Sequence, residues 1–200
     1  MIVKQIVPII EKGGPNSTKI EELMLQIVSS IGQMEHPAGS DQFLLYNEKK
    51  GNGVKPIKDT FLVDLLRFNW LLEHRVDVGV TNTKPGPIDA VYPIDNKFFA
   101  VEWETGNISS SHRAINKMVT GILRKQLLGG VLILPSREMY DYLTDRVGNF
   151  RELAPYFDVW RMANYDISEG YLYVIEIEHH GLTNDPACRI SKGTDGRALL

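Results

Sequence analysis

The stretch "IDAVYPIDNKFFAVEWETGNISSSHRAINK" (residues 88–117) contains the pattern that decides the fold. Residues 88–92 and 97–104 are apolar runs of strand length on either side of the turn "PIDN", which predicts a β-hairpin. A hydroxyl-rich segment and then a basic segment with apolar residues at helical spacing follow, which predicts a helix over 108–126. A strand–strand–helix unit of this kind indicates an α/β protein.

Two glutamates interrupt the second strand of this hairpin. Glu102 and Glu104 are two residues apart, so their side chains point to the same face of a strand. If the hairpin turns at Asp95 and Asn96, Asp89 lies opposite Glu102, with Cβ atoms roughly 5 Å apart. Three carboxylates on a buried sheet repel one another unless a cation lies between them. Oxygen ligands without His or Cys suit hard cations such as Mg²⁺, which can clamp a phosphate and activate water.

A solvated strand face is the alternative interpretation of alternating glutamates. Glu176 and Glu178 have the same spacing in "VIEIE" (residues 174–178). We interpret that pair as a solvent-facing or edge strand, because no aspartate or basic helix accompanies it. Spacing alone therefore leaves both interpretations of Glu102 and Glu104 open.

The rest of the chain predicts a mixed sheet with flanking helices. Further helices are expected at 17–31, at 57–74 with Glu73 at its end, at 137–145 and around residue 151. Further strands are expected at 130–135, at 157–160 and at 171–178. The run at 130–135 is apolar throughout, which indicates a strand covered on both faces. Residues 35–56 are expected to be irregular, and residues 189–200 a loop or tail.

The composition predicts one globular domain over residues 1–200. The chain is 43% hydrophobic and 24% charged, which is typical of a protein with a substantial core. No apolar run approaches the roughly 18–20 residues that span a bilayer, and the N-terminal segment lacks signal-peptide features. We therefore expect a cytoplasmic protein without membrane contact. Cys188 is the only cysteine, which excludes an intramolecular disulfide and a cysteine-based zinc site. The net charge of −3 lacks the basic footprint of many nucleic-acid-binding proteins, although a carboxylate cluster itself adds negative charge.

Several motifs, in order, resemble one enzyme family. They are "NGVKPIK" (52–58), "NWLLE" (69–73), "GPID" (86–89), "VEWETGNISSSHRAINK" (101–117), "YDYLTDRVGNFRELAPYF" (140–157) and "KGTDG" (192–196). Together they resemble the BamHI group of type II restriction endonucleases, a branch of the PD-(D/E)XK nucleases. The resemblance covers most of the chain from about residue 50 onward and is close enough to suggest an isoschizomer. It implies an α/β, PD-(D/E)XK restriction-endonuclease-like fold with a central mixed β-sheet flanked by α-helices.

The resemblance also implies catalytic roles. Asp89 matches the aspartate of the PD motif and Glu102 the acidic position after it. Glu104 stands where most of the superfamily has lysine, which is a mark of the BamHI group. Asp89 and Glu102 are expected to bind metal, Glu73 to support a second metal, and Glu104 to act as the general base or to orient water. The implied cofactor is Mg²⁺, with Mn²⁺ as a substitute and Ca²⁺ binding without supporting cleavage.

DNA-contacting residues follow from the same resemblance. They are Asn107, Ser109, Arg113, Asp145, Arg146, Asp195 and Lys58. Asn107, Ser109 and Arg113 lie at the start of the helix over 108–126 and are expected to read bases. Asp145 and Arg146, in "LTDRV", are expected to do the same. Arginine can donate to guanine, aspartate can accept from cytosine N4, and asparagine can pair with adenine. Asp195 is expected to reach the minor groove or the backbone, and Lys58 a phosphate.

The family reads GGATCC and cuts after the first G to leave 5′ overhangs. A palindrome requires a homodimer in which each subunit reads one half-site of double-stranded DNA. The apolar residues Met118, Val119, Ile122 and Leu123 are expected either to form the dimer interface or to pack on the chain's own sheet. A companion DNA methyltransferase is expected in the same system, but not as a stable complex.

Two other functions stay open. A structure-selective PD-(D/E)XK repair nuclease would need the carboxylates but not the base-reading residues. A non-cutting DNA-binding protein on the same fold would be expected to lose the carboxylates first.

Overall fold

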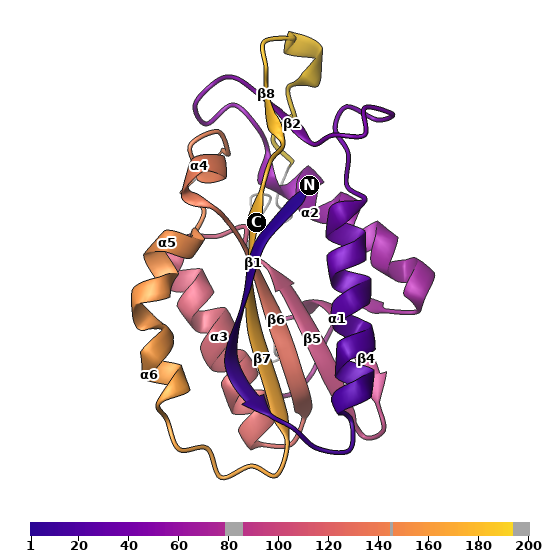
Figure 1. The fold of residues 1–200 in the computed structure, drawn as a ribbon, viewed down its shortest axis with the longest axis vertical. Coiled ribbons are helices and arrows are strands. Elements are labelled where there is room, and N and C mark those ends of the chain that lie inside the picture. Colours follow the sequence, from indigo (N-terminus) through magenta and orange to yellow (C-terminus); the bar gives the residue numbers. More distant parts are fainter. Residues whose placement is uncertain (79–85, 145, 194–200) are drawn as a thin grey trace.

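A six-stranded mixed β-sheet forms the centre of the protein (Figure 1). The computed structural model describes residues 1–78, 86–144 and 146–193. The strands lie in the order β1, β7, β6, β5, β4, β3. Their bounds are β1 Ile2–Lys12, β3 Leu71–His74, β4 Ile88–Ile94, β5 Lys97–Trp103, β6 Leu127–Pro135 and β7 Gly170–Glu178. The β5–β6 and β6–β7 pairs are parallel and the other pairs antiparallel. The predicted mixed sheet is confirmed.

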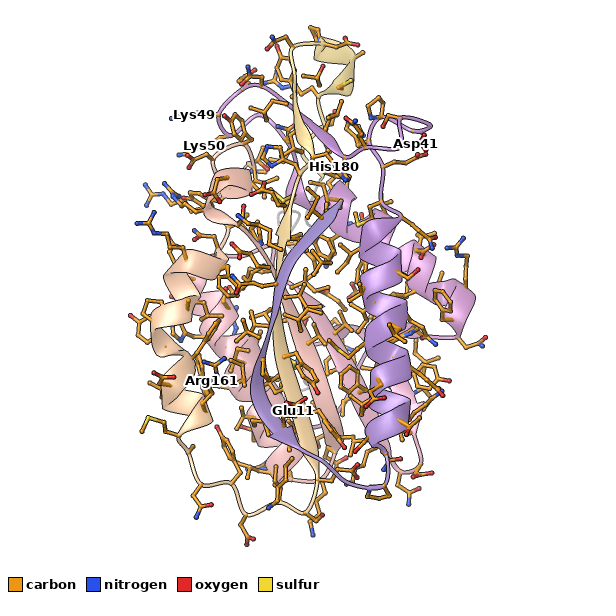
Figure 2. All side chains as sticks on the ribbon, in the orientation of Figure 1. Glu11, Asp41, Lys49, Lys50, Arg161 and His180 are labelled. Carbon is orange, nitrogen blue, oxygen red and sulfur yellow. The ribbon has the colours of Figure 1, made fainter. Side chains whose placement is uncertain are left out.

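Helices cover both faces of this sheet (Figure 1). The longer ones are α1 Ser17–Gly32, α2 Val54–Leu65 and α3 Ile108–Leu123, and the short ones are α4 Arg137–Tyr140, α5 Phe150–Leu153 and α6 Phe157–Arg161. Helices α1 and α2 contribute Leu23 and Phe61 to a core on one face. Helices α3, α5 and α6 contribute Ile115, Leu153 and Trp160 to a core on the other face. Side chains fill the space between helices and sheet on both sides (Figure 2).

The hairpin predicted around Asp95 and Asn96 is confirmed. Its strands pair from Ile94 opposite Lys97 to Ala90 opposite Val101, which fixes a two-residue turn. Asp95 has φ of 50°, a left-handed conformation that aspartate tolerates better than most residues. Strand β6 is buried along its whole length, as its uninterrupted apolar sequence predicts.

The helix predicted over 57–74 ends earlier than expected. Helix α2 stops at Leu65, and a 3₁₀ turn, η1 Leu66–Phe68, follows. Asn69 then adopts φ of 64°, which ends the helical path. The chain continues as β3, because the open edge of β4 offers backbone hydrogen-bond partners. Glu73 therefore lies on a strand, and its predicted place at a helix end is wrong.

Three other elements differ from expectation. Residues 157–160 form part of α6 instead of a strand, since Phe157 and Trp160 lie three apart and both face the core. The helix predicted over 137–145 is the single turn α4. Part of the irregular segment 35–56 forms β2, Leu44–Tyr46, which pairs in parallel with β8, Gly181–Thr183, beyond the main sheet (Figure 1).

Strand β7 is an interior strand and not the solvent-facing or edge strand predicted from its glutamates. It lies between β6 and β1, a strand not expected from the sequence. Glu176 is buried and accepts a hydrogen bond from the side chain of Gln5 on β1 at 2.6 Å. Strand β1 has irregular register around Pro8, a residue that sheets tolerate at edge strands.

The apolar stripe of α3 packs mainly on the chain's own sheet. Met118, Val119 and Ile122 are buried in the core of that face. Leu123 is the exposed member, with 46% of its surface accessible. Among helices in the described part of the chain, none combines the length and apolar character needed to cross a bilayer.

Candidate active site

Three carboxylates lie at the same level on three neighbouring strands. The β3–β4 register places Glu73 opposite Asp89. The β4–β5 register, continued one residue beyond Ala90–Val101, places Asp89 opposite Glu102. Glu73 has φ of 48°, a conformation that non-glycine residues adopt at a cost of about 1–3 kcal/mol and that is enriched at functional sites. The hairpin thus brings together two of the predicted ligands, and β3 adds the third.

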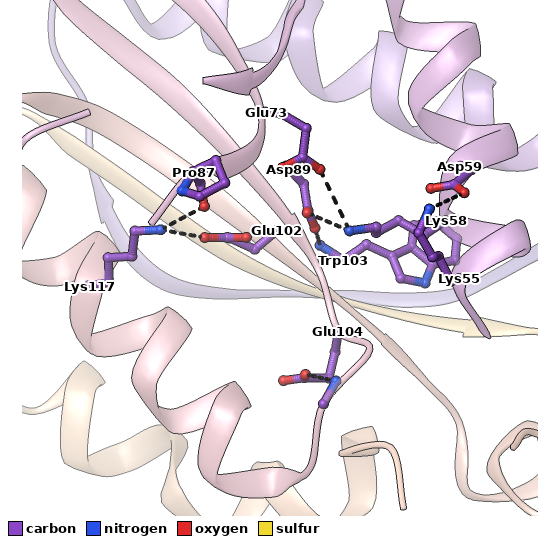
Figure 3. Close-up of polar contacts among 11 residues, drawn as sticks. Lys55, Lys58, Asp59, Glu73, Pro87, Asp89, Glu102, Trp103, Glu104 and Lys117 are labelled. Atoms are coloured by element: carbon purple, nitrogen blue, oxygen red, sulfur yellow. Dashed lines mark hydrogen bonds and ion pairs between the residues drawn. The ribbon is translucent and has the colours of Figure 1, made fainter. Parts of the chain in front are cut away.

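Asp89 is held from two sides. Its Oδ2 accepts a hydrogen bond from the backbone N–H of Trp103 at 2.8 Å. Its Oδ1 accepts from Nζ of Lys58 on α2 at 2.7 Å (Figure 3). The same ammonium lies 3.9 Å from Oε1 of Glu73. Burial of the Lys58 ammonium disfavours its charge and lowers its pKa. The negative charges of Asp89 and Glu73 outweigh this effect, so the pKa of Lys58 lies above its ordinary value. Lys58, which we expected to contact a phosphate, here neutralises two carboxylates.

Glu102 has a different cationic partner. Nζ of Lys117 on α3 donates to its Oε1 at 2.9 Å and lies 3.4 Å from the carbonyl oxygen of Pro87. Burial and then the charge of Asp89 raise the pKa of Glu102, and Lys117 opposes that shift. The two lysines approach the sheet from helices on opposite faces, so Asp89 and Glu102 are each covered by one ammonium (Figure 3).

Glu104 is positioned separately from the other three carboxylates. It follows β5 directly, and its side chain points toward the start of α3. Its Oε1 accepts from the backbone N–H of Gly106 at 2.6 Å, and its Oε2 accepts from the hydroxyl of Ser111. Only 5% of its surface is accessible. Burial raises the pKa of Glu104 to about 7, against the lowering effect of these two hydrogen bonds.

All four carboxylates line one open cleft of about 960 Å³. The polar residues along its wall are Lys55, Lys58, Glu73, Asp89, Glu102, Glu104, Thr105, Ser109, Ser110, His112, Arg113, Asn116, Lys117 and Thr120. Cationic and anionic side chains therefore share a single hollow between α2, the hairpin and α3. A cleft with this lining can accept a polyanion against its lysines and arginine while presenting carboxylates to it.

The donor set of this cleft suits a hard divalent cation. Among the described residues, no three His, Cys, Asp or Glu side chains are gathered tightly enough to hold a metal ion as they stand. A cation nevertheless already lies between Asp89 and Glu73, namely the ammonium of Lys58. The carboxylates of Asp89, Glu102 and Glu73 supply only oxygen, the ligand type that Mg²⁺ prefers. The chemistry of this donor set fits a magnesium ion, and in this structure Lys58 and Lys117 contact its oxygens.

Comparison with known proteins identifies the family. The family model described as "Restriction endonuclease BamHI" matches residues 1–197. The type II restriction enzyme OkrAI of Oceanobacter kriegii is 50% identical over 199 residues, which cover 100% of both chains. The type II restriction enzyme BamHI of Bacillus amyloliquefaciens is 36% identical over 187 residues, covering 88% of this chain and 83% of BamHI. The chain belongs to the BamHI family. It is a type II restriction endonuclease, as its motifs predicted.

Solved structures place this BamHI-family chain in the expected fold. The restriction endonuclease BglII in complex with a DNA 16-mer matches with a TM-score of 0.58 at 10% identity, covering 89% of this chain and 79% of that one. Free BglII matches with a TM-score of 0.50 at 10% identity, covering 96% and 91%. The restriction-endonuclease-like fold is thereby confirmed.

The start of α3 carries three of the base-reading residues expected in the BamHI family. Asn107 is the N-cap, and its Oδ1 accepts from the backbone N–H groups of Ser109 and Ser110 at 3.1 and 3.3 Å. Arg113 donates to the hydroxyl of Ser110 at 3.1 Å. Asn107, Ser109 and Arg113 are exposed, and the last two line the cleft.

Arg146 belongs to a segment that contacts the loop before α3. Two residues after it, the backbone N–H of Gly148 donates to the carbonyl of Gly106 at 2.7 Å. Arg146 is exposed and does not line the cleft itself. Asp145 and Asp195, the other two expected DNA contacts, lie outside the described residues.

Two residues of the cleft had no role predicted from sequence. Lys117 is four residues after Arg113, so both lie on one face of α3, and this spacing was a usable signal. Ser111 is fully buried and touches Glu104. Its position two residues after exposed Ser109 gives no such signal, because three consecutive serines look alike in the sequence.

Proposed function

We propose that this type II restriction endonuclease hydrolyses double-stranded DNA at the palindrome GGATCC in a Mg²⁺-dependent reaction. The cut follows the first G on each strand and leaves 5′ overhangs. The observation that most strongly supports the proposal is a single cleft lined by Asp89, Glu102, Glu104 and the start of α3. Full-length similarity to OkrAI and to BamHI, both type II restriction enzymes, supports it.

Asp89, Glu102 and Glu73 are the proposed holders of Mg²⁺. When bound there, the ion would stabilise negative charge on the scissile phosphate and make water more acidic. The chain's part is to place these three residues side by side on neighbouring strands. The bond from Trp103 N–H to Asp89 at 2.8 Å orients the central carboxylate for this purpose.

Glu104 is the proposed general base. Each of its oxygens has one fixed donor, Gly106 or Ser111, and each retains a lone pair that can accept from water. The pKa of Glu104 is about 7. A general base is most effective when its pKa lies near the operating pH, so this carboxylate suits a reaction at neutral pH. A proton taken from the attacking water would reside on this carboxylate while the water oxygen bonds to phosphorus and the bond from phosphorus to the 3′ oxygen breaks. The leaving 3′ oxygen would take a proton from solvent, which gives 5′-phosphate and 3′-hydroxyl ends.

Base recognition is assigned to Asn107, Ser109, Arg113 and Arg146, with Asp145. The Oδ1 atom of Asn107 caps α3, which leaves its Nδ2 group to donate to a base. The positive end of the α3 helix dipole favours a nearby phosphate. Asp195 is proposed to contact the minor groove or backbone. The BglII complex contains DNA in a related fold.

A homodimer is the assembly that a palindromic site requires. Each subunit would read one half-site and cut one strand, and a companion methyltransferase would protect the host's own sites. With most of the α3 stripe packed in the core, Leu123 is the member of that stripe available to an interface.

Plasmid cleavage tests the function directly. The purified protein is incubated with a plasmid of known sequence and Mg²⁺, with EDTA as a control, and the fragment ends are sequenced. Discrete fragments that all begin with 5′-GATC support the proposal. A smear would instead support a structure-selective nuclease, and tight binding without cutting would support a DNA-binding protein that has lost its activity.

A further inference from the structure

Two lysines cover the carboxylates that the proposed function assigns to Mg²⁺. Lys58 and Lys117 come from helices on opposite faces of the sheet, and they contact Oδ1 of Asp89 and Oε1 of Glu102 at 2.7 and 2.9 Å. The four side chains are 12–17% accessible. Removing the ammonium from such a buried ion pair would leave a buried carboxylate without a compensating charge, which is strongly unfavourable. Each carboxylate therefore needs a cation beside it at all times.

The lysines and a divalent ion compete for the same atoms. A metal ligand distance of about 2.0–2.6 Å to Oδ1 of Asp89 would bring the ion close to the Lys58 ammonium. Two like charges at such short range repel strongly in a partly buried site. The ion can therefore bind well only if Lys58 and Lys117 move.

Both side chains have somewhere to move. Lys58 and Lys117 line the cleft, and each has a flexible four-carbon stem with a compact charge at its end. A DNA phosphate in the cleft would offer each ammonium a new anionic partner. Without DNA, the cleft offers them nothing better than the carboxylates.

We propose that Lys58 and Lys117 are internal counter-cations that exclude divalent metal from Asp89 and Glu102 until DNA draws the ammonium groups away. The inference rests on the proposed function for the identity of the metal site. It makes metal binding conditional on substrate, so that the DNA-free enzyme binds divalent ions weakly.

Titration with Mn²⁺ in the absence of DNA tests this proposal. Binding is measured by calorimetry for the wild type, Lys58→Met and Lys117→Met, since methionine keeps much of the stem and removes the charge. Each variant is expected to bind Mn²⁺ at least about tenfold more tightly than the wild type. Lys55→Met is the matched control: Lys55 lines the same cleft on α2, but it pairs with Asp59 at 2.5 Å. Its Mn²⁺ affinity should equal that of the wild type.

Equal or weaker Mn²⁺ binding by both Lys58→Met and Lys117→Met would overturn the proposal. Thermal melting gives a second readout if either variant folds poorly. The metal-free variants should melt below the wild type, and saturating Mn²⁺ should remove that difference. A difference that persists at saturation would also contradict the proposal. Because neither measurement uses DNA cleavage, a failure here is distinct from a failure to cut GGATCC.

Discussion

The hydroxyl of Ser111 donates a hydrogen bond to Oε2 of Glu104, across seven residues of sequence. Gly148 packs so closely on this hydroxyl that a Cβ at position 148 would clash with it. Ser111 is therefore locked in place between the start of α3 and the segment that carries Arg146. The contact fixes the direction in which the Glu104 carboxylate faces the cleft.

Replacing Ser111 should impair chemistry more than binding. For Ser111→Ala we expect kcat to fall roughly 10- to 100-fold, because a base that is free to rotate spends less time aligned with water. KM should change little. The hydrogen bond also lowers the pKa of Glu104, so its loss should shift the acid limb of the kcat–pH profile to higher pH. An unshifted limb with a normal kcat would show that Ser111 does not position the base.

The raised pKa of Glu104 predicts a pH-dependent stability penalty. The folded value is about 7 and the ordinary value 4.5, so the folded protein binds this proton more tightly than the unfolded chain. Stability then falls as pH rises from about 4.5 to 7, and the whole loss is present above that range. Glu104→Gln, which cannot titrate, should be more stable than the wild type by roughly 2–3 kcal/mol at pH 8. At pH 5 the gain should be much smaller, as measured by urea unfolding of the metal-free protein.

Glu178 provides a control of opposite sign. Burial disfavours its charge, but hydrogen bonds from His179 and Ser136 prevail and lower its pKa. Its contribution to stability is present above the unfolded pKa and is lost as pH falls. Glu178→Gln should therefore destabilise the protein at pH 8. A Glu104→Gln gain that does not depend on pH would contradict the assigned titration.

Removing a proposed metal ligand should separate cutting from binding. Glu102→Ala should reduce cleavage of a GGATCC duplex by at least roughly 100-fold, while gel-shift affinity in Ca²⁺ stays near that of the wild type. Glu176→Gln is the matched control: Glu176 is a buried glutamate on β7 that pairs with Gln5 and does not line the cleft. It should cut at the wild-type rate. Normal cleavage by Glu102→Ala would show that the ligand is misassigned.

A base-reading residue should affect specificity rather than overall affinity. Arg146→Ala is expected to lose about 1–3 kcal/mol of discrimination at one base position, measured by competition with singly substituted duplexes. Arg161→Ala removes the same charge from α6, where Arg161 donates to the carbonyl oxygen of Pro8 on β1 and does not line the cleft, and should leave the preference unchanged. Equal preference for every duplex in the Arg146 variant would contradict its role.

Local patterns predicted the centre of the site well. Asp95 and Asn96 favour a tight turn, and the alternation that follows from it places Asp89 opposite Glu102. The same logic failed at Glu73. Leu65, Leu66 and Leu72 fit a helical period, and nothing in the spacing indicates that Asn69 leaves the helix with φ of 64°.

Long-range pairing could not be predicted from spacing. Lys58 and Asp89 are 31 residues apart, and they meet only because α2 packs beside β4. Glu176 looked solvated because its neighbour β1 was not recognised as a strand. In the first case the partner is set by how a helix packs on the sheet and in the second by sheet order, and no short window of one sequence encodes either.

We infer that Asp89, Glu102 and Glu73 hold a divalent ion against DNA after Lys58 and Lys117 have moved aside. Anomalous diffraction from crystals of the protein with a GGATCC duplex and Mn²⁺ measures this directly. We predict a peak within about 2.0–2.6 Å of Asp89 and Glu102 oxygens, with both ammonium groups shifted toward phosphates. A complex with ordered DNA in which Lys58 still contacts Asp89, and Mn²⁺ lies elsewhere, would rule out this metal site.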